Sequence, residues 1–256
     1  MSSFKKMISI LDLFSKDRTV WTTDEINDAL DLTKPTTYRY IRELTEVGLL
    51  ARMTGGSYIL GPKIIELDYK IRWSDPLIAV SVPVMKEIQQ LSGCDVLLSG
   101  MYNDKVLIIH DEQRLDDFKL RRGVLLPLFR GAMSKIILAY LQRNQLQNIY
   151  EKYTEEIAGN GLGESWEKFR LYLSGLRKQG YSISHEELVP NMTAISAPIF
   201  QYGQVRCSIS VGLPTNRFHL FKEERLVELV VGTAERITRL VKGHPAATEH
   251  ANFAGD

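Results

Sequence analysis

The sequence has few cysteines, no long apolar run and almost no net charge, and each shortage argues against a class of protein. Its two cysteines, Cys94 and Cys207, lie far apart and form no metal-ligand spacing, so we expect buried thiols in a reducing cytoplasm. No apolar run approaches the roughly 20 residues that cross a bilayer. The first residues, Met1 to Lys6, do not form a secretory signal. We therefore expect a cytoplasmic protein without membrane, metal or cofactor.

The composition, 44% hydrophobic and 25% charged, is typical of a soluble globular protein, and 256 residues suffice for two domains. The formal net charge is only +1, and residues 1–60 contain eight bases and eight acids. The charges are nevertheless segregated, because residues 24–31 contain four acids and no base while residues 34–42 contain three bases and no acid. A local basic face of this kind is the minimum that phosphate binding requires.

Three helical patterns and a hairpin pattern fill the first sixty residues. Ser3 can cap the first helix, which we expect to run to Phe14, and Thr22 or Thr23 can cap the second. Thr33 can cap the third helix, with Pro35 in its first turn. Gly48 would end that helix, and two short apolar stretches, 49–53 and 58–60, flank a Gly-Gly turn.

This order of elements predicts a winged helix-turn-helix, whose third helix enters the major groove of DNA. Thr37, Ile41 and Leu44 would face the core, because they fall at i, i+4 and i+7. Arginine can pair with guanine, and threonine and tyrosine can bond phosphates or bases. The residues that we expect to bind DNA are Lys34, Pro35, Thr36, Tyr38, Arg39 and Arg42 of the helix and Arg52 and Ser57 of the wing.

The rest of the chain alternates between strand and helix patterns. Residues 63–73 form a helical pattern that Asp75-Pro76 breaks. Its apolar stripe, formed by Ile64, Leu67 and Ile71, can pack on neighbouring elements or on a second subunit. Later segments predict an α+β domain with a mainly antiparallel sheet. The strands are expected at 95–101, 105–110, 183, 195–200 and 205–213, and the helices at 77–91, 131–142, 164–179 and 223–241. The predicted organisation is a winged helix-turn-helix domain at 1–61, a linker helix at 62–75, a second domain at 76–242 and a disordered tail at 243–256.

Three groups of residues together resemble the IclR-type bacterial transcriptional regulators, from about Phe4 to Val241. The first group is Lys34-Pro35-Thr36-Thr37-Tyr38-Arg39-Tyr40-Ile41 with Glu46-Val47-Gly48-Leu49-Leu50 and Tyr58-Ile59-Leu60-Gly61. The second is Gly123 with Leu126-Pro127-Leu128-Phe129-Arg130-Gly131-Ala132-Met133-Ser134-Lys135 and Ile137-Leu138-Ala139. The third is Gly180-Tyr181 with Glu186-Glu187 and Ile195-Ser196-Ala197-Pro198-Ile199-Phe200.

The resemblance implies a GAF-like effector-binding domain, dimers formed through the DNA-binding half, and tetramers in some members. The family's effectors are held by backbone amides of the turn at 131–134, and free N–H groups at a helix start favour a carboxylate. Many members have His where this chain has Phe129, and a Cys or polar residue where it has Ala194. The pocket of this chain is therefore expected to be more apolar than theirs and to take a larger, aromatic acid. The implied effector-binding residues are Leu115, Phe118, Leu120, Leu126, Ala132, Met133, Ser134, Ser184 and Ser210.

The sequence also bears on other classes of function. The sequence has no Gly-x-Ser-x-Gly elbow, P-loop or dinucleotide fingerprint, which argues against an enzyme using the C-terminal pocket. His185 beside Glu186-Glu187 is better explained as a solvated strand end, and Lys135 as a salt-bridging residue. A winged helix can also bind RNA or protein, and the basic helix alone does not distinguish these partners from DNA.

Overall fold

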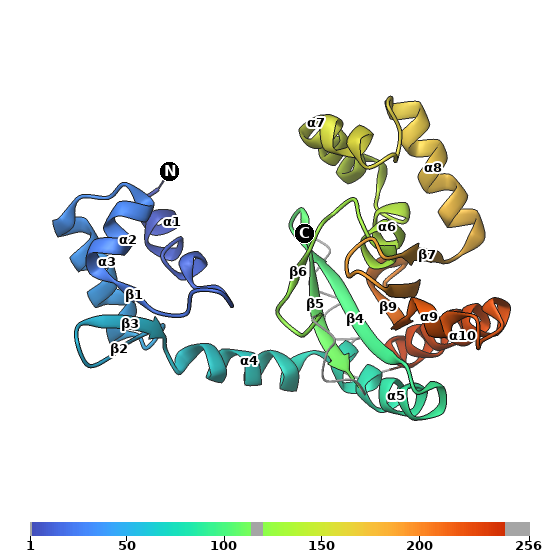
Figure 1. Cartoon of the computed structure of the whole chain (residues 1–256), viewed down its shortest axis with the longest axis horizontal. Helices are drawn as coiled ribbons and strands as arrows, with labels where there is room; N and C mark the ends of the chain where they lie inside the picture. The colour runs from blue at the N-terminus through green and yellow to red at the C-terminus, as the bar shows by residue number, and fades with distance from the viewer. Residues whose placement is uncertain (1, 114–119, 244–256) are drawn as a thin grey trace. The chain divides into compact units, whose positions relative to one another are not determined.

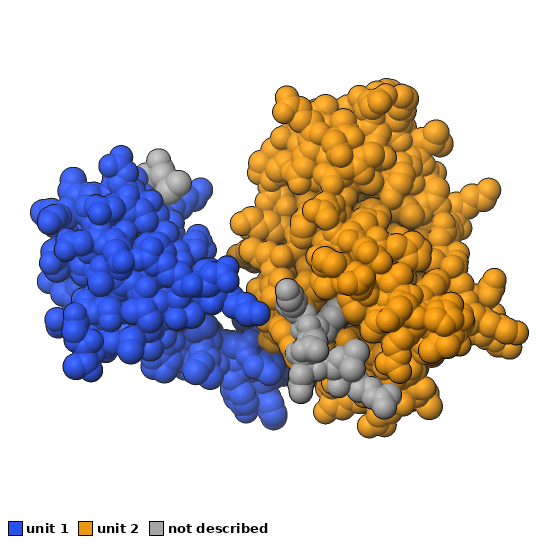
Figure 2. All heavy atoms as spheres, in the orientation of Figure 1, with its two compact units in different colours: residues 1–75 blue, residues 76–256 orange. Residues whose placement is uncertain are grey.

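The computed structural model describes residues 2–113 and 120–243. The chain divides into two compact units, residues 1–75 and residues 76–256, which are coloured separately in Figure 2. Each unit has its own buried apolar cluster.

The first unit is a small helical bundle with a three-stranded sheet. Its elements are α1 (Ser3–Ile8), η1 (Leu11–Leu13), β1 (Trp21–Thr22), α2 (Thr23–Leu30), α3 (Lys34–Glu46), β2 (Leu50–Arg52), β3 (Ser57–Leu60) and α4 (Lys63–Ser74). Thr22 begins α2 with a capping box, since its side chain accepts from the Glu25 N–H and the Glu25 carboxylate accepts from the Thr22 N–H at 2.8 Å. The sheet order is β1-β3-β2, all antiparallel.

Helix α3 is held against the rest of the first unit by an apolar face. Ile41 and Leu44 are buried together with Ile26 of α2 and Leu50 of β2. Thr37 is also buried, so the three positions predicted to face the core do so. The arrangement of α2, α3 and the β2–β3 hairpin confirms the predicted winged helix-turn-helix.

The second unit is built on a six-stranded antiparallel sheet in the order β6-β5-β4-β9-β8-β7. Its strands are β4 (Asp95–Tyr102), β5 (Lys105–Glu112), β6 (Leu125–Leu126), β7 (Ser182–His185), β8 (Met192–Gln201) and β9 (Gln204–Pro214). Its helices are α5 (Pro76–Ser92), α6 (Ala132–Ala139), α7 (Arg143–Gly159), α8 (Trp166–Gln179), α9 (Thr215–Phe218) and α10 (Glu223–Lys242). Strands and helices in this arrangement confirm the predicted α+β domain.

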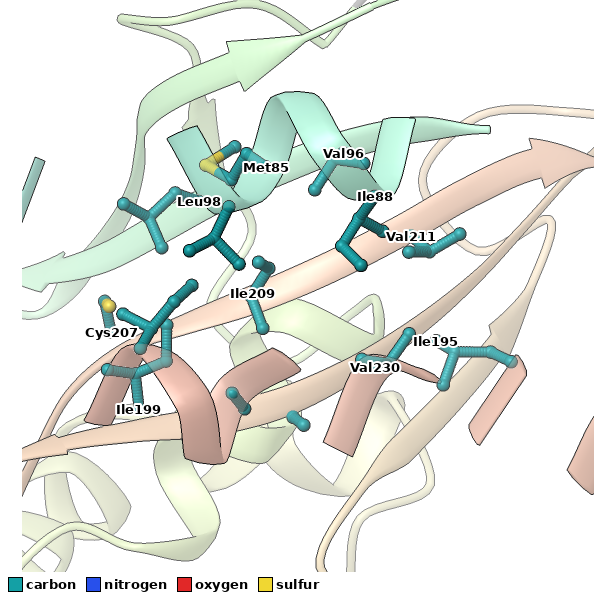
Figure 3. Close-up of a cluster of buried hydrophobic side chains, with 14 of the residues drawn as sticks. Met85, Ile88, Val96, Leu98, Ile195, Ile199, Cys207, Ile209, Val211 and Val230 are labelled. Atoms are coloured by element: carbon teal, nitrogen blue, oxygen red, sulfur yellow. The ribbon is translucent and has the colours of Figure 1, made fainter. Parts of the chain in front are cut away.

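The two faces of this sheet differ in chemistry. Helices α5 and α10 cover one face, where Val96, Ile195 and Ile209 pack against Met85 and Val230 in an all-apolar layer (Figures 1 and 3). Helix α6 covers the other face, and α8 packs on α6. The face under α6 contains buried serines, which belong to the candidate ligand site described below.

Several expected boundaries were wrong. Helix α1 ends at Ile8 instead of running to Phe14, because a separate short 3-10 helix follows. The helix expected at 131–142 ends at Ala139, and α7 follows it although no helix was predicted there. Residues 244–256, where a disordered tail was expected, lie outside the described residues.

Both cysteines are buried thiols, as expected. Among the described residues, no helix is both long and apolar enough to cross a membrane, and no group of three or more potential metal-binding side chains occurs.

Candidate nucleic-acid interface and ligand site

The outward face of α3 carries most of the side chains that were predicted to bind DNA. Lys34, Pro35, Tyr38, Arg39 and Arg42 are exposed, whereas Thr36 is half-buried. The helix presents these side chains because its other face is fixed in the core of the first unit.

The wing and α3 enclose a hollow of about 640 Å³. Arg52 of β2 lines this hollow together with Arg39 and Arg42 of α3. Three arginines therefore surround one concave surface, which is the arrangement needed to follow a phosphate backbone while reading base edges. The hollow is lined by Pro35, Tyr38, Arg39, Ile41, Arg42, Thr45, Glu46, Arg52 and Tyr58.

Two cations of α3, one beside the hollow and one lining it, form weak, exposed ion pairs. Lys34 Nζ lies 3.5 Å from Asp24, and Arg42 Nε lies 3.7 Å from Glu46. Exposed pairs of this kind contribute little to stability, so phosphate oxygens can replace the carboxylates at small cost.

The structure brings together five of the eight predicted DNA-binding residues around the hollow; Lys34, Thr36 and Ser57 do not line it. Sequence reasoning missed Thr45, although it continues the helical series Pro35, Tyr38, Arg42, Thr45. It also missed Tyr58, whose position on the inner side of the wing depends on the pairing of β3 with β1 and β2.

A second candidate site lies where α6 begins. Gly131 precedes the helix with a φ of 81°, a left-handed conformation that favours glycine. Ala132, Met133 and Ser134 form the buried first turn. Within the described chain, their N–H groups donate to no protein acceptor, because the residues one turn earlier are not helical. Such a turn can bind an anion.

The sheet face opposite this turn is lined with small hydroxyl groups, which we call the serine face. Ser99 Oγ lies 2.9 Å from Ser208 Oγ, and Ser208 Oγ donates to the Met133 carbonyl oxygen at 3.3 Å. The second bond shows that the serine face points toward α6. The face comprises Ser99, Ser182, Ser184, Ser196, Ser208 and Ser210, all buried.

Two buried hydroxyls between the helix and the sheet lack a hydrogen-bond partner among the described residues. They are Ser134 Oγ on α6 and Ser182 Oγ on β7. Leaving a buried hydroxyl unpaired costs about 1–3 kcal/mol, so these groups are suited to bind a polar ligand or water. Ser210 Oγ, by contrast, already pairs with Ser196 Oγ at 2.5 Å.

The predicted effector-binding residues are placed as follows. Ser134, Ser184 and Ser210 lie on α6 and the serine face, and Leu126 and Met133 share the apolar cluster beneath α6. Leu120 is half-buried beside that cluster, and Ala132 is buried in the first turn. Leu115 and Phe118 lie outside the described residues.

Two described hollows of the second unit, of about 430 and 300 Å³, are lined by other residues. Sequence reasoning missed the other four serines of the serine face. For Ser182 and Ser208 the available signal was their alternation with Ser184 and Ser210, two residues apart on a strand.

The segment between β7 and β8 contacts the same turn from outside. Glu187 Oε2 accepts from the Gly131 N–H at 2.8 Å, and Glu187 Oε1 lies 2.5 Å from Lys135 Nζ. Lys135 is buried, and this ion pair confirms its predicted structural role. From the sequence, Glu187 was expected at a solvated strand end beside His185; it is instead half-buried and paired with Lys135.

Comparison with known families agrees with both units. The IclR helix-turn-helix domain matches residues 3–53, and the family described as bacterial transcriptional regulator IclR C-terminal matches residues 73–239. The chain is 27% identical to the HTH-type transcriptional regulator KdgR of Escherichia coli, over 90% of this chain and 88% of that protein. It is also 27% identical to KipR of Bacillus subtilis, over 92% and 95% of the two chains.

Solved structures show the same fold. An IclR homologue from Microbacterium hydrocarbonoxydans, crystallised with 4-hydroxybenzoate, superposes with a TM-score of 0.79 at 23% identity, covering 95% of this chain and all of that one. The IclR protein of Thermotoga maritima superposes with a TM-score of 0.68 at 21% identity, over 93% and 97% of the two chains. The relatives with assigned names are regulators of transcription. The chain therefore belongs to the IclR family of DNA-binding bacterial transcriptional regulators.

Proposed function

We propose that this regulator reads an inverted-repeat DNA site as a dimer and that a small organic acid, held between α6 and the serine face, controls its affinity for that site. The observation that carries the DNA-binding part is the hollow between α3 and the wing, where Arg39, Arg42 and Arg52 meet.

The residues of that surface differ in the part of the DNA that each can contact. Arg39 and Arg42 project from the exposed face of α3 and are suited to base edges in the major groove. Arg52 lies on the wing, where it is suited to the phosphate backbone or minor groove. Lys34, Thr36 and Ser57 stand beside the hollow and would position the protein through phosphates.

The effector part rests on the unfilled hydrogen-bonding groups around the start of α6. Three backbone N–H groups and the Ser134 hydroxyl, all buried, have no protein partner within the described chain. A carboxylate offers acceptors for these donors and is favoured by the positive end of the helix dipole. Phe129 is buried and Ala194 is small, so the surroundings favour an aromatic acid. The 4-hydroxybenzoate bound by the Microbacterium homologue is a compound of this class.

The dimer part rests on α4, which carries an uncovered apolar stripe on a different face from the one predicted from sequence. Ile65, Tyr69 and Trp73 recur every four residues and are 74%, 65% and 80% exposed. Exposed stripes of large apolar residues mark interaction surfaces. A second copy of the same helix is the natural occupant, because an inverted-repeat DNA site is read by two copies related by twofold symmetry.

Control of DNA binding would follow from linkage between the two sites. The acid must bind one arrangement of the paired DNA-binding units better than another, and it then shifts the population between them. The spacing of the two α3 helices would change relative to half-sites about 34 Å apart, or a multiple of this distance.

Selection of binding sites from a random-sequence duplex pool tests the DNA-binding part. We expect the purified protein to enrich one inverted repeat, and the R39A/R42A double variant to lose or relax that enrichment. The R225A/R236A variant removes two exposed arginines from α10 and serves as the matched control. Failure to enrich any sequence, or stronger binding to structured RNA in direct competition, would contradict the proposal.

A panel of organic acids tests the effector part. We expect at least one aromatic acid, with benzoate and 4-hydroxybenzoate as the first probes, to bind in calorimetric titration and to change the affinity for the selected duplex. Binding of two-carbon acids alone would contradict the expectation of a larger, aromatic effector.

A further inference from the structure

Glu187 occupies a position that an acidic ligand would also favour. Its carboxylate accepts from the Gly131 N–H at the start of α6 and from the ammonium group of Lys135 one turn later. These are a helix N-terminus and a buried cation, the same two features that attract an external carboxylate. The chain therefore supplies its own anion to this turn.

The contact also fixes the segment between β7 and β8. The Arg130 side chain donates to the carbonyl oxygen of Glu187, and Leu188 packs so closely on Gly131 that an added Cβ there would lie 2.4 Å from Leu188 Cδ1. The segment, residues 186–191, is thus fastened to the α6 turn by one charged group, one backbone hydrogen bond and one apolar contact. We call it the latch segment.

The same turn has unused hydrogen-bond donors that can bind a second anion. The N–H groups of Ala132, Met133 and Ser134 have no acceptor within the described residues. Ser134 Oγ is fully buried and also lacks a partner there, which independently indicates that this turn is built to bind something else. Two carboxylates on one helical turn would share the helix dipole and the single ammonium group of Lys135, and would repel each other.

We propose that Glu187 is an internal competitor of the acid effector, and that binding of the acid weakens the hold of Glu187 on α6 and releases the latch segment. This inference rests on the proposed effector site. By linkage, the closed latch lowers the affinity for the acid by the same factor by which the acid loosens the latch.

The E187Q variant tests this competition, since it removes one negative charge and keeps the size of the side chain. We expect 4-hydroxybenzoate or benzoate to bind E187Q about threefold to tenfold more tightly than the wild type, as one repulsive charge pair is removed from a partly screened site. The neutral analogue 4-hydroxybenzamide should show no such gain. The matched control is E186Q, which makes the same change one residue away, where the Glu186 carboxylate forms no hydrogen bond or ion pair with another described residue.

A second measurement follows the latch segment directly. Hydrogen–deuterium exchange at residues 186–191 should rise when the wild-type protein is saturated with the acid, and should already be raised in E187Q without it. Far-UV circular dichroism of E187Q shows whether the variant retains its fold.

The outcomes separate this inference from the proposed function. If E187Q binds the acid no more tightly than the wild type, or if the acid protects residues 186–191 from exchange, Glu187 has only a structural role. The proposed effector site would still stand in that case. If no acid of the panel binds either the wild type or E187Q, both the effector site and the competition are overturned.

Discussion

Thr37 Oγ1 donates a hydrogen bond to Asn27 Oδ1 over 3.1 Å, which joins α3 to α2 inside the helix-turn-helix. Thr37 is fully buried, so its hydroxyl has no access to water. The bond fixes the angle at which α3 is presented, because Asn27 lies in the last turn of α2 and Thr37 in the first turns of α3.

Replacing Thr37 with valine tests this relationship at nearly constant volume. We expect T37V to destabilise the first unit by about 1–2 kcal/mol, because the Asn27 carbonyl oxygen loses its partner. Hydrogen–deuterium exchange of the α2 and α3 amides in the full chain measures the loss. T45V is the control, since the Thr45 hydroxyl bonds only the Ile41 carbonyl of its own helix. Equal effects of the two variants would show that the α2–α3 bond has no special role.

Gly61, where the wing meets α4, is expected to tolerate no side chain. A Cβ at this position would lie 2.1 Å from the carbonyl oxygen of Gly48, and the backbone cannot move away because the Gly61 N–H donates to the Leu49 carbonyl at 2.8 Å. We expect G61A to cost about 1–3 kcal/mol by overpacking and to lower the midpoint in scanning calorimetry.

The contrasting variant is G232A in α10, where an added Cβ meets nothing within 4 Å. There we expect a gain of about 0.5–1 kcal/mol, because alanine favours a helix more than glycine does. An unchanged midpoint for G61A would show that the turn between β3 and α4 can rearrange.

The parts of the fold that could be predicted from sequence are those with a strong local signal. Thr22 with Glu25 marks the start of α2, and Thr37, Ile41 and Leu44 mark the buried face of α3. Helix α7 was missed although its buried residues Leu146, Ile149 and Ile157 fall at i, i+3 and i+11, a spacing that one helical face allows; the helix is kinked at Tyr153. Strand β1 has only two residues and exists through its pairing with β3, a contact that no local pattern encodes.

The candidate sites show the same division. The outward residues of α3 follow from helical spacing, so they could be named in advance. Of the serine face, Ser184 and Ser210 were named from the family resemblance. The other four serines were not, because the strand order that brings them together is set by the fold. Glu187 was out of reach for the same reason, since its partners lie 52 and 56 residues away.

Asp104 should make the stability of the second unit depend on pH in acid. Hydrogen bonds from Lys152 and then Tyr153 lower the pKa of Asp104 from its ordinary value of 3.8 to about 2. A carboxylate whose pKa is lower in the folded state stabilises fully above its unfolded pKa and loses that contribution as the pH falls through the folded value. The contribution is therefore present above about pH 4 and is lost toward about pH 2.

Urea unfolding of wild type and D104N measures this effect. We expect D104N to unfold at lower urea concentration near pH 6, and the difference to shrink as the pH falls toward about 2.5. E164Q provides the comparison, because Glu164 pairs only with the exposed Lys168 of the following turn. A difference between D104N and wild type that stays constant with pH would exclude the charge as its cause.

The stripe on α4 should control the oligomeric state. Tyr69 and Trp73 stack with their ring centroids 6.4 Å apart and are largely exposed, so burying them against a second α4 would remove a large apolar area from water. We expect the Y69S/W73S variant to halve the mass measured by sedimentation equilibrium, whether the wild type is a dimer or a tetramer. It should also weaken binding to the selected inverted repeat, since each half-site would then be read alone.

The control for this variant is L171S on α8, because Leu171 is an isolated leucine that is 73% exposed. Its substitution should leave the mass unchanged, which separates the stripe from a general loss of surface hydrophobicity. A wild-type protein that sediments as a monomer, or a Y69S/W73S variant of unchanged mass, would show that α4 does not pair with a second copy. In the latter case the inverted repeat would require contacts elsewhere in the chain to bring two α3 helices together.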